Sequence, residues 1–313
     1  MEKKWFVALL MVVVMMCACW TGAVADEERK TFTSGDYQYA LLDDGTVEIA
    51  GYKGSADLLA IPAELDGKAV TSIGDCAFYL CSSLTSVSIP DSVEQIGTNP
   101  FAACFELKTI SVSPEHPYFA TIDGVLFRKA DKALISYPAS ISSSTYTIPQ
   151  GITSIGDSAF FYCDSLTSVS IPDSITSIGD SAFFWCSSLT SVSIPDSVTS
   201  IGDSAFSYCD SLTSVSIPDS VTSIGDEAFY SCSSLTSVSI PDSVTAIGNR
   251  AFYYCDSLTS VSIPNSVTAI GDYAFSDCPN LTLTVPRNSY AAEYAKTHNI
   301  PYTYPDANDW LNN

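Results

Sequence analysis

The chain repeats one phrase of 23 residues, and this repeat constrains its fold more than any other feature. The stretch "SAFFWCSSLTSVSIPDSVTSIGD" begins at Ser181, and "SAFSYCDSLTSVSIPDSVTSIGD" follows it at Ser204. The prolines that close the phrase keep the same period, at Pro149, Pro172, Pro195, Pro218, Pro241 and Pro264. A fixed period of this length, with leucine and isoleucine at set offsets, is the signature of a leucine-rich solenoid.

Each repeat carries the chemistry of a strand, a turn and a corner. Val169 and Ile171 alternate with serines, the period-2 pattern of a half-buried strand, and the next proline ends it. Gly156 predicts a tight corner, and Asp157 or Ser158 predicts the cap of a short helical turn. A single coil cannot bury its own apolar edge, so coils must stack. The sequence predicts a mostly β leucine-rich repeat solenoid with parallel strands and short helical turns, with one strand-bearing coil per 23 residues.

The stretch "LTSVSIPDSVTSIGDSAFSYC" resembles the repeat of the BspA-like, or Treponema-type, leucine-rich repeat family. The likeness runs from about Val70 to Pro286. "DYQYALLDDGTVEIAGYKGSADLLAIPAELDGKAVTSIG" is similar to the N-terminal cap of that family, and "VPRNSYAAEYAKTHNIPYTY" to its C-terminal cap, a short helix and a closing strand. The resemblance implies an extracellular binding protein, because related proteins are associated with attachment to host matrix proteins and to other cells.

Residues 1–25 match a secretory signal peptide. A short basic start precedes the apolar run Trp5–Trp20, and small residues precede a cleavage point expected after Ala25. Lipid attachment at Cys17 or Cys19 is the alternative. The apolar run is shorter than the roughly 20 residues of a membrane helix, so we expect a secreted, extracellular or cell-surface protein with no membrane span in the mature chain.

The rest of the chain divides into two caps and a repeat region, interrupted once. The predicted parts are an N-terminal cap over 26–69, leucine-rich repeats over 70–286 and a C-terminal cap over 287–313. Pro114 and Pro149 are 35 residues apart rather than 23, which predicts a hairpin insert at about 114–147. At its tip lie three basic residues, Arg128, Lys129 and Lys132. They form either a solvated turn or a secondary docking spot.

The charge of the chain excludes some partners. Asp and Glu number 35 against 13 Lys and Arg, for a formal net charge of -22. Nucleic acids and anionic membranes both require basic surfaces, so we expect neither as a partner. The acidic surface serves solubility.

No catalytic or zinc motif occurs in the sequence, which predicts no enzyme, no cofactor and no metal. The two histidines, His116 and His298, lie far apart. Eight of the nine cysteines after residue 25 occupy one repeat position, and Cys76 is the exception; we expect free, buried thiols, with disulfides between neighbouring coils as the alternative. Two acidic columns recur, at Asp157, Asp180, Asp203, Asp226 and Asp272 and at Asp173, Asp196, Asp219 and Asp242. They are turn-formers or, alternatively, weak calcium sites.

The positions that vary lie between the repeated phenylalanine and cysteine. They include Phe161, Tyr162, Phe184, Trp185, Tyr208, Tyr230, Tyr253 and Tyr254. These rings either pack against the same rings of adjacent coils or form a ligand-binding stripe, since exposed tyrosine and tryptophan are typical of recognition surfaces. The serine-lined sheet face is another candidate.

Two functions remain open. One is a secreted or cell-surface, adhesin-like binding protein that mediates protein-protein or cell-host attachment through an extracellular protein or glycan ligand. The other is a structural or spacer repeat protein without a specific ligand.

Overall fold

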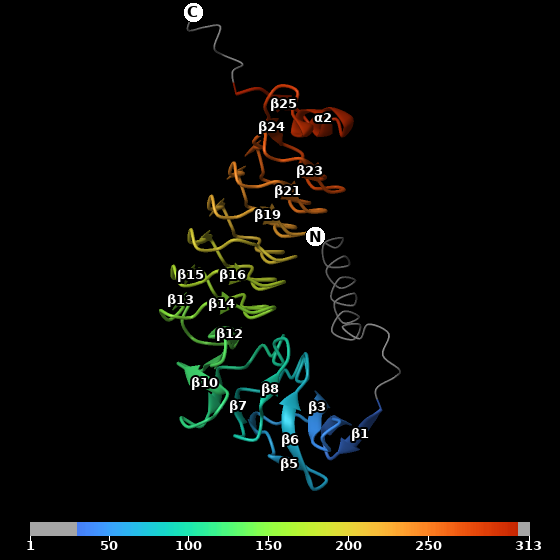
Figure 1. Ribbon diagram of the computed structural model, residues 1–313, viewed down its shortest axis with the longest axis vertical. Coiled ribbons are helices and arrows are strands. Elements are labelled where there is room, and N and C mark those ends of the chain that lie inside the picture. The colour runs from blue at the N-terminus through green and yellow to red at the C-terminus, as the bar shows by residue number, and fades with distance from the viewer. Residues whose placement is uncertain (1–29, 306–313) are drawn as a thin grey trace, which may run out of the picture.

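The computed structural model describes residues 30–305 and shows coils stacked into an elongated solenoid with a cap at each end (Figure 1). The predicted signal peptide, residues 1–25, lies outside the described residues. Within residues 30–305, no helix is long and apolar enough to cross a membrane.

The strand predicted around Val169 forms the main face of the solenoid. Ser168 pairs with Ser191 and Val169 with Val192, so each partner lies 23 residues further along the chain. The parallel sheet comprises β13 (Thr145–Thr147), β15 (Ser168–Ser170), β17 (Ser191–Ser193), β18 (Ser214–Ser216), β20 (Ser237–Ser239), β22 (Ser260–Ser262), β24 (Thr282–Thr284) and β25 (Tyr302–Thr303). The central valine of each repeat strand is buried and its serines reach the surface.

Most coils also carry a second, shorter parallel strand, beyond the one that the sequence predicts. These strands are β14 (Ser154–Ile155), β16 (Ser177–Ile178), β19 (Ser223–Ile224), β21 (Ala246–Ile247) and β23 (Ala269–Ile270). Single bridges through Ile201 connect Ile178 to Ile224 and continue the ladder. The isoleucine of each pair is buried in the core.

The third side of each coil is a run of turns. The sequence predicts short helical turns at this place. Ala159, Phe161 and Cys163 donate their N–H groups three residues back within the coil. Ser158 and Tyr162 have φ angles of 55° and 60°, a left-handed conformation that a continuous helix does not contain. The N–H groups of the alternate residues donate to the next coil, as in Phe160 to the carbonyl of Ala182 at 2.8 Å. All three sides of the coil are therefore hydrogen-bonded to a neighbour.

The repeat glycine is required by the close approach of neighbouring coils rather than by the corner that the sequence suggests. Gly202 lacks a positive φ, but a Cβ built on it would lie 2.6 Å from the carbonyl carbon of Gly179 and 2.7 Å from the backbone nitrogen of Asp180. Because backbone atoms cannot move aside easily, only glycine fits between the stacked coils.

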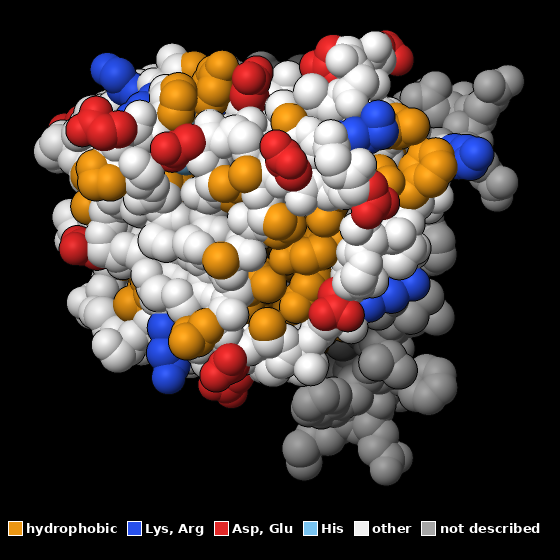
Figure 2. All heavy atoms as spheres, turned by 90° about the horizontal axis from the view of Figure 1, so that it is seen from below, with side chains coloured by type: hydrophobic (Ala, Val, Ile, Leu, Met, Phe, Trp, Pro, Cys, Tyr) orange, Lys and Arg blue, Asp and Glu red, His pale blue; other side chains and the backbone are white. Residues whose placement is uncertain are grey.

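The N-terminal cap begins as an antiparallel sheet that turns into the first coils. Its strands and those of the first coils are β1 (Thr31–Ser34), β2 (Tyr37–Leu41), β3 (Val47–Tyr52), β4 (Leu58–Ala60), β5 (Glu64–Leu65), β6 (Lys68–Ile73), β7 (Ser86–Ile89), β8 (Gln95–Ile96) and β9 (Thr109–Val112). From β3 onward the pairing β3–β6–β8 is parallel. Viewed from this end, hydrophobic side chains gather in an open area between charged ones (Figure 2). Leu41 and Leu58 of the cap are exposed.

The C-terminal end has the helix and closing strand that the resemblance implies. Helix α2 (Tyr290–Thr297) begins at Ser289, whose side chain accepts a hydrogen bond from the N–H of Ala292. Ala291, Tyr294 and other residues of α2 join the repeat core, and β25 extends the main sheet.

The insert is a three-stranded antiparallel sheet that separates two hydrophobic cores. Its strands are β10 (Phe119–Ile122), β11 (Val125–Arg128) and β12 (Ala133–Ser136). Val125, Phe127 and Leu134 pack into the C-terminal core, whereas Leu126 and Ile135 pack into the N-terminal one. Strands β11 and β12 are buried on both faces and form an internal wall, so the insert is part of the fold. Its two turns, at Asp123 and at Lys132, are exposed.

We expect Gly202→Ala to lower the free energy of unfolding by about 1–3 kcal/mol, the usual range for overpacking. The added methyl group must push apart two coils whose backbones already touch. Chemical denaturation followed by circular dichroism measures the change. Ser200→Ala, at an exposed position of the same coil, is the control and should shift stability by less than about 0.5 kcal/mol. Equal stability of the two variants would contradict the close-approach argument.

Candidate functional site

The eight predicted aromatic residues form one continuous run along an edge of the solenoid. The rings of Tyr162 and Trp185 stack at 5.0 Å and 11°, and those of Trp185 and Tyr208 stack at 4.7 Å and 23°. The run then passes from Tyr208 to Tyr230 at 5.3 Å and from Tyr230 to Tyr253 at 5.4 Å. Phe161, Phe184 and Tyr254 pack beside it.

The structure divides these eight residues into two groups by exposure. Phe161, Phe184, Tyr208 and Tyr230 are buried, and they form a small hydrophobic cluster of their own. Tyr162, Trp185, Tyr253 and Tyr254 are half-buried and pack against that cluster. The sequence left open whether these rings pack between coils or bind a ligand. The four residues of the first group pack between coils. Only the second group presents ring edges to solvent, and we call it the aromatic edge.

The backbone holds part of the aromatic edge in an unusual conformation. Tyr162, Trp185 and Tyr254 have φ angles of 60°, 61° and 58°, in the left-handed region that bulky residues seldom adopt. Ser231 takes the same place in its coil with a φ of 57°. Ala103 and Asp277 also have this conformation, with φ angles of 57° and 56°, so it belongs to the coil and not to the ring.

The stacking also limits what the aromatic edge can bind. Both faces of the Trp185 ring are covered, one by Tyr162 and the other by Tyr208. Sugar rings stack on open aromatic faces, and those of Trp185 are occupied. The available surface consists of ring edges, which carry partial positive charge, and of phenol groups.

Burial keeps the tyrosines of this region neutral. It raises the pKa of Tyr162 to about 12, with a smaller contribution from nearby Tyr79. Burial likewise raises the pKa of Tyr208 and of Tyr253. At physiological pH these phenols carry no charge, as a tyrosine of ordinary pKa also does not. The hydroxyl of Tyr208 is buried, so Tyr162, Tyr253 and Tyr254 are the tyrosines of the run that face solvent.

The serine-lined face is flat and polar but has one irregularity. The ladder between β18 and β20 contains only the pair Ser214–Ser237, whereas three residue pairs join β17 to β18. An open depression of about 410 Å³ lies there, bordered by Ser216, Ser239 and Asp219 among others. Threonines beside the strands bind coil to coil, as in Thr190 Oγ1 to the carbonyl of Thr167 at 3.1 Å.

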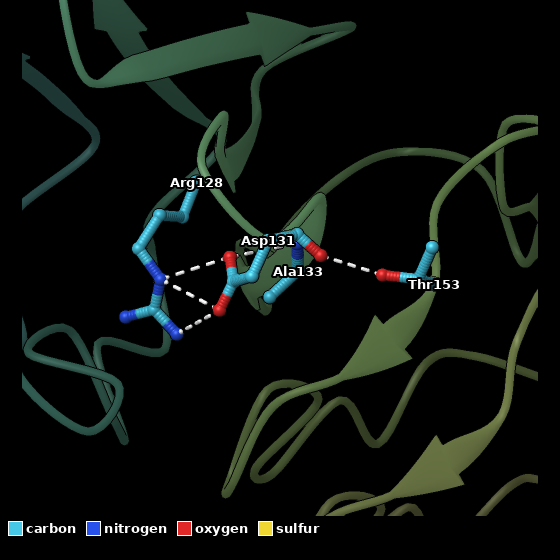
Figure 3. Close-up of polar contacts among 4 residues, drawn as sticks. All are labelled: Arg128, Asp131, Ala133 and Thr153. Atoms are coloured by element: carbon cyan, nitrogen blue, oxygen red, sulfur yellow. Dashed lines mark hydrogen bonds and ion pairs between the residues drawn. The ribbon is translucent and has the colours of Figure 1, made fainter.

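The three basic residues of the insert are only partly available. Arg128 donates from Nε and Nη2 to the Asp131 carboxylate, at 3.0 and 2.8 Å (Figure 3). This guanidinium lowers the pKa of Asp131. Lys129 donates from Nζ to the carbonyl of His116 at 2.6 Å. Lys132 is exposed at the turn, so the structure does not assemble the three into one cationic site.

The first acidic column is a hydrogen-bonded ladder. Asp157 Oδ1 accepts from the N–H of Asp180 at 2.9 Å, and Asp180 Oδ1 accepts from that of Asp203 at 2.8 Å. Asn249 continues the column and accepts from Asp272 at 2.9 Å. Each side chain thus links its coil to the next through a hydrogen bond. The sequence predicted that Asp157 caps a short helical turn and did not predict this link between coils. The residues of the second column, from Asp173 onward, are exposed turn positions.

The ladder places carboxylates in neighbouring coils near one another. Partial burial raises the pKa of Asp203 above its ordinary value of 3.8, and the charges of Asp180 and Asp226 raise it further. Within residues 30–305, no group of three or more His, Cys, Asp or Glu side chains is arranged to hold a metal ion.

The repeat cysteines are structural. The nine cysteines of the described residues are free thiols. Cys186 Sγ donates to the carbonyl of Phe160 at 3.1 Å, and the same bond recurs 23 residues later from Cys209 to Phe183. Burial raises the pKa of these thiols, so they are not activated nucleophiles. His116 is also fully buried, with its ring bound to backbone groups of Pro90, Tyr118 and Phe119.

A family profile described as "BspA type Leucine rich repeat region (6 copies)" matches residues 63–143 and 136–222, together just over half of the chain. The chain belongs to the BspA-type leucine-rich repeat family. No curated protein matches this BspA-type chain.

Two solved structures share the BspA-type solenoid fold. A leucine-rich repeat protein from Eubacterium ventriosum superposes with a TM-score of 0.66 at 22% identity, over 83% of this chain and 92% of the other. A leucine rich cell surface protein from Faecalibacterium prausnitzii has a TM-score of 0.50 at 24% identity, over 87% of this chain and 98% of that one. At such identities the likeness concerns the fold alone.

We expect Asp203→Asn to stabilise this BspA-type solenoid at pH 7. A raised pKa means that the folded state binds the proton more tightly than the unfolded state, so stability falls as pH rises from 3.8 through the folded pKa and stays lower above it. The amide removes this loss and keeps an acceptor for Asp226, as Asn249 does for Asp272. Melting temperatures at pH 3 and pH 7 measure the effect.

The reverse substitution is the control for this prediction. Asn249→Asp adds a carboxylate and removes the hydrogen bond from Asn249 Nδ2 to Asp226 Oδ2. It should lower the melting temperature more at pH 7 than at pH 3. A pH dependence unchanged in both variants would show that repulsion along the ladder is negligible.

Proposed function

We propose that this chain is a secreted or cell-surface binding protein, adhesin-like, which attaches to an extracellular protein through the aromatic edge. The observation that carries the proposal is the pre-stacked run from Tyr162 through Trp185 to Tyr253. Aromatic anchors contribute most when their conformation is fixed before binding, because less side-chain entropy is lost.

A protein ligand suits this surface better than a glycan. Both faces of the Trp185 ring, the largest of the aromatic edge, are covered by neighbouring rings and are closed to a sugar. Phenol groups and ring edges instead complement backbone carbonyls and carboxylates of a folded protein. The acidic charge of the chain, -22, favours a ligand with a neutral or basic surface around the contact.

Binding rather than catalysis agrees with the chemistry of the described residues. The thiols of Cys186 and Cys209 are fully buried and have raised pKa values, and the ladder carboxylates bind backbone groups. The F. prausnitzii relative in fold is described as a cell surface protein. The predicted signal peptide at residues 1–25 would bring this chain to the same compartment.

The test is a binding screen of residues 26–313 against immobilised host matrix proteins. The triple variant Tyr162→Ser, Trp185→Ser, Tyr254→Ser removes three of the four rings of the aromatic edge, at the repeat position where Ser231 already has the same backbone conformation. We expect the triple variant to bind the matrix protein that the wild type binds in the screen at least about tenfold more weakly, since each hot-spot residue contributes more than about 1 kcal/mol. Surface plasmon resonance measures the affinity.

Tyr273→Ser supplies the control, because Tyr273 is 57% exposed yet lies outside the aromatic edge. It should bind as the wild type does. Circular dichroism must show that the triple variant is folded at the assay temperature. Undiminished binding by the folded triple variant would refute the proposed site, and a wild-type chain that binds nothing in the screen would favour the spacer function.

A further inference from the structure

The second strand of the coils forms a ladder that stops at the insert. In the C-terminal coils, Thr176 and Gly179 donate their N–H groups to the carbonyls of Thr153 and Ile155. In the N-terminal coils the same bonds run from Glu94 to Thr71 and from Gly97 to Ile73. Each coil thus offers two carbonyls to the coil that follows.

At the insert these two carbonyls lose their donors. The next coil after β8 begins at Thr153, but Thr153 and Gly156 donate to the carbonyls of Lys132 and Leu134 instead, at 3.0 and 2.9 Å. Strand β12 therefore takes the place that β8 would have filled. Among the described strands, β8 pairs with β6 alone. The carbonyls of Glu94 and Ile96 lie along its other, open edge.

A cleft of about 400 Å³ lies beside this open edge. It is lined on one side by Ile96 and Gly97 of the β8 coil and on the other by Ser154 and Gly156. Arg128 of β11 also borders it. We call this space the β8 cleft.

The charge around the β8 cleft is negative. Asp75 and Asp157 line it. Asp75 Oδ1 accepts from the N–H of Thr98, and Asp157 is the first member of the acidic ladder. Glu94 is exposed beside them. The positive charge of Arg128 is already paired with Asp131, so the carboxylates dominate.

We propose that the β8 cleft binds an extended segment of a partner protein that carries lysine or arginine residues. The segment adds a strand to β8, its N–H groups donating to the carbonyls of Glu94 and Ile96, in the manner of strand addition to an open sheet edge. Its basic side chains pair with Asp75 and Asp157. This surface is separate from the aromatic edge, and the proposal stands whether or not that edge binds a ligand.

The test uses a blocked heptapeptide, Lys-Val-Lys-Val-Lys-Val-Lys, and isothermal titration calorimetry with residues 26–313. A second peptide carries N-methyl groups on alternate residues and so lacks the donors along one edge; a third carries glutamate in place of lysine. We expect the lysine peptide to bind, and the other two to bind at least about tenfold more weakly.

The variant Asp75→Asn, Asp157→Asn removes both cleft charges and keeps the acceptors, as Asn249 does in the same column. It should weaken binding of the lysine peptide roughly tenfold, the effect of two exposed ion pairs. Asp203→Asn removes the same kind of charge outside the cleft and should leave the affinity unchanged. Absence of binding, equal binding of the N-methylated peptide, or an equal loss in Asp203→Asn would each overturn the proposal.

Discussion

The parallel register of 23 residues between coils is the constraint on which the rest of the structure depends. Pairs such as Val169 with Val192 place each side chain against its own equivalent in the next coil. Hydrogen bonds on three sides of the coil then satisfy backbone groups that would otherwise be buried without partners. The core follows from the same register, since Phe160 stacks on Phe183 at 4.7 Å and 10°.

Stacking like upon like benefits some side chains and penalises others. Aromatic rings gain from it, and threonine hydroxyls reach the carbonyl one coil back. Carboxylates are penalised, because partial burial and, to a smaller extent, the charges of Asp180 and Asp226 raise the pKa of Asp203, and a methyl group at Gly202 would meet backbone. Some repeat positions therefore vary between coils, such as the position of Asn249 in the acidic column. They are positions where stacking identical side chains is unfavourable or contributes little to stability.

Much of the fold could be predicted from the sequence because periodicity determines register. The strand at Val169 and the position of the insert followed from spacing and turn residues, and the two caps from the family resemblance. The sequence could not predict whether the side chain of Tyr208 points into the core or toward solvent. Its backbone is left-handed, and no glycine or asparagine, the residues that usually mark this conformation, stands at this position. The longer proline spacing from Pro114 to Pro149 suggested a hairpin, yet burial of both faces of β11 is a tertiary property that periodicity does not contain. The β8 cleft escaped prediction for the same reason.

The insert shows what a break in register requires. Asn99 lies where the third-side ladder stops, and its side chain binds across the gap, from Nδ2 to the carbonyl of Ser158 at 2.6 Å and from Oδ1 to the hydroxyl of Ser136 at 2.6 Å. One buried amide thus replaces part of a lost backbone ladder, on the side of the coil where the cores meet. On the neighbouring side nothing among the described residues replaces it, and the carbonyls of β8 stay open. A continuous solenoid has sheet edges only at its ends; this one has gained an edge in its middle.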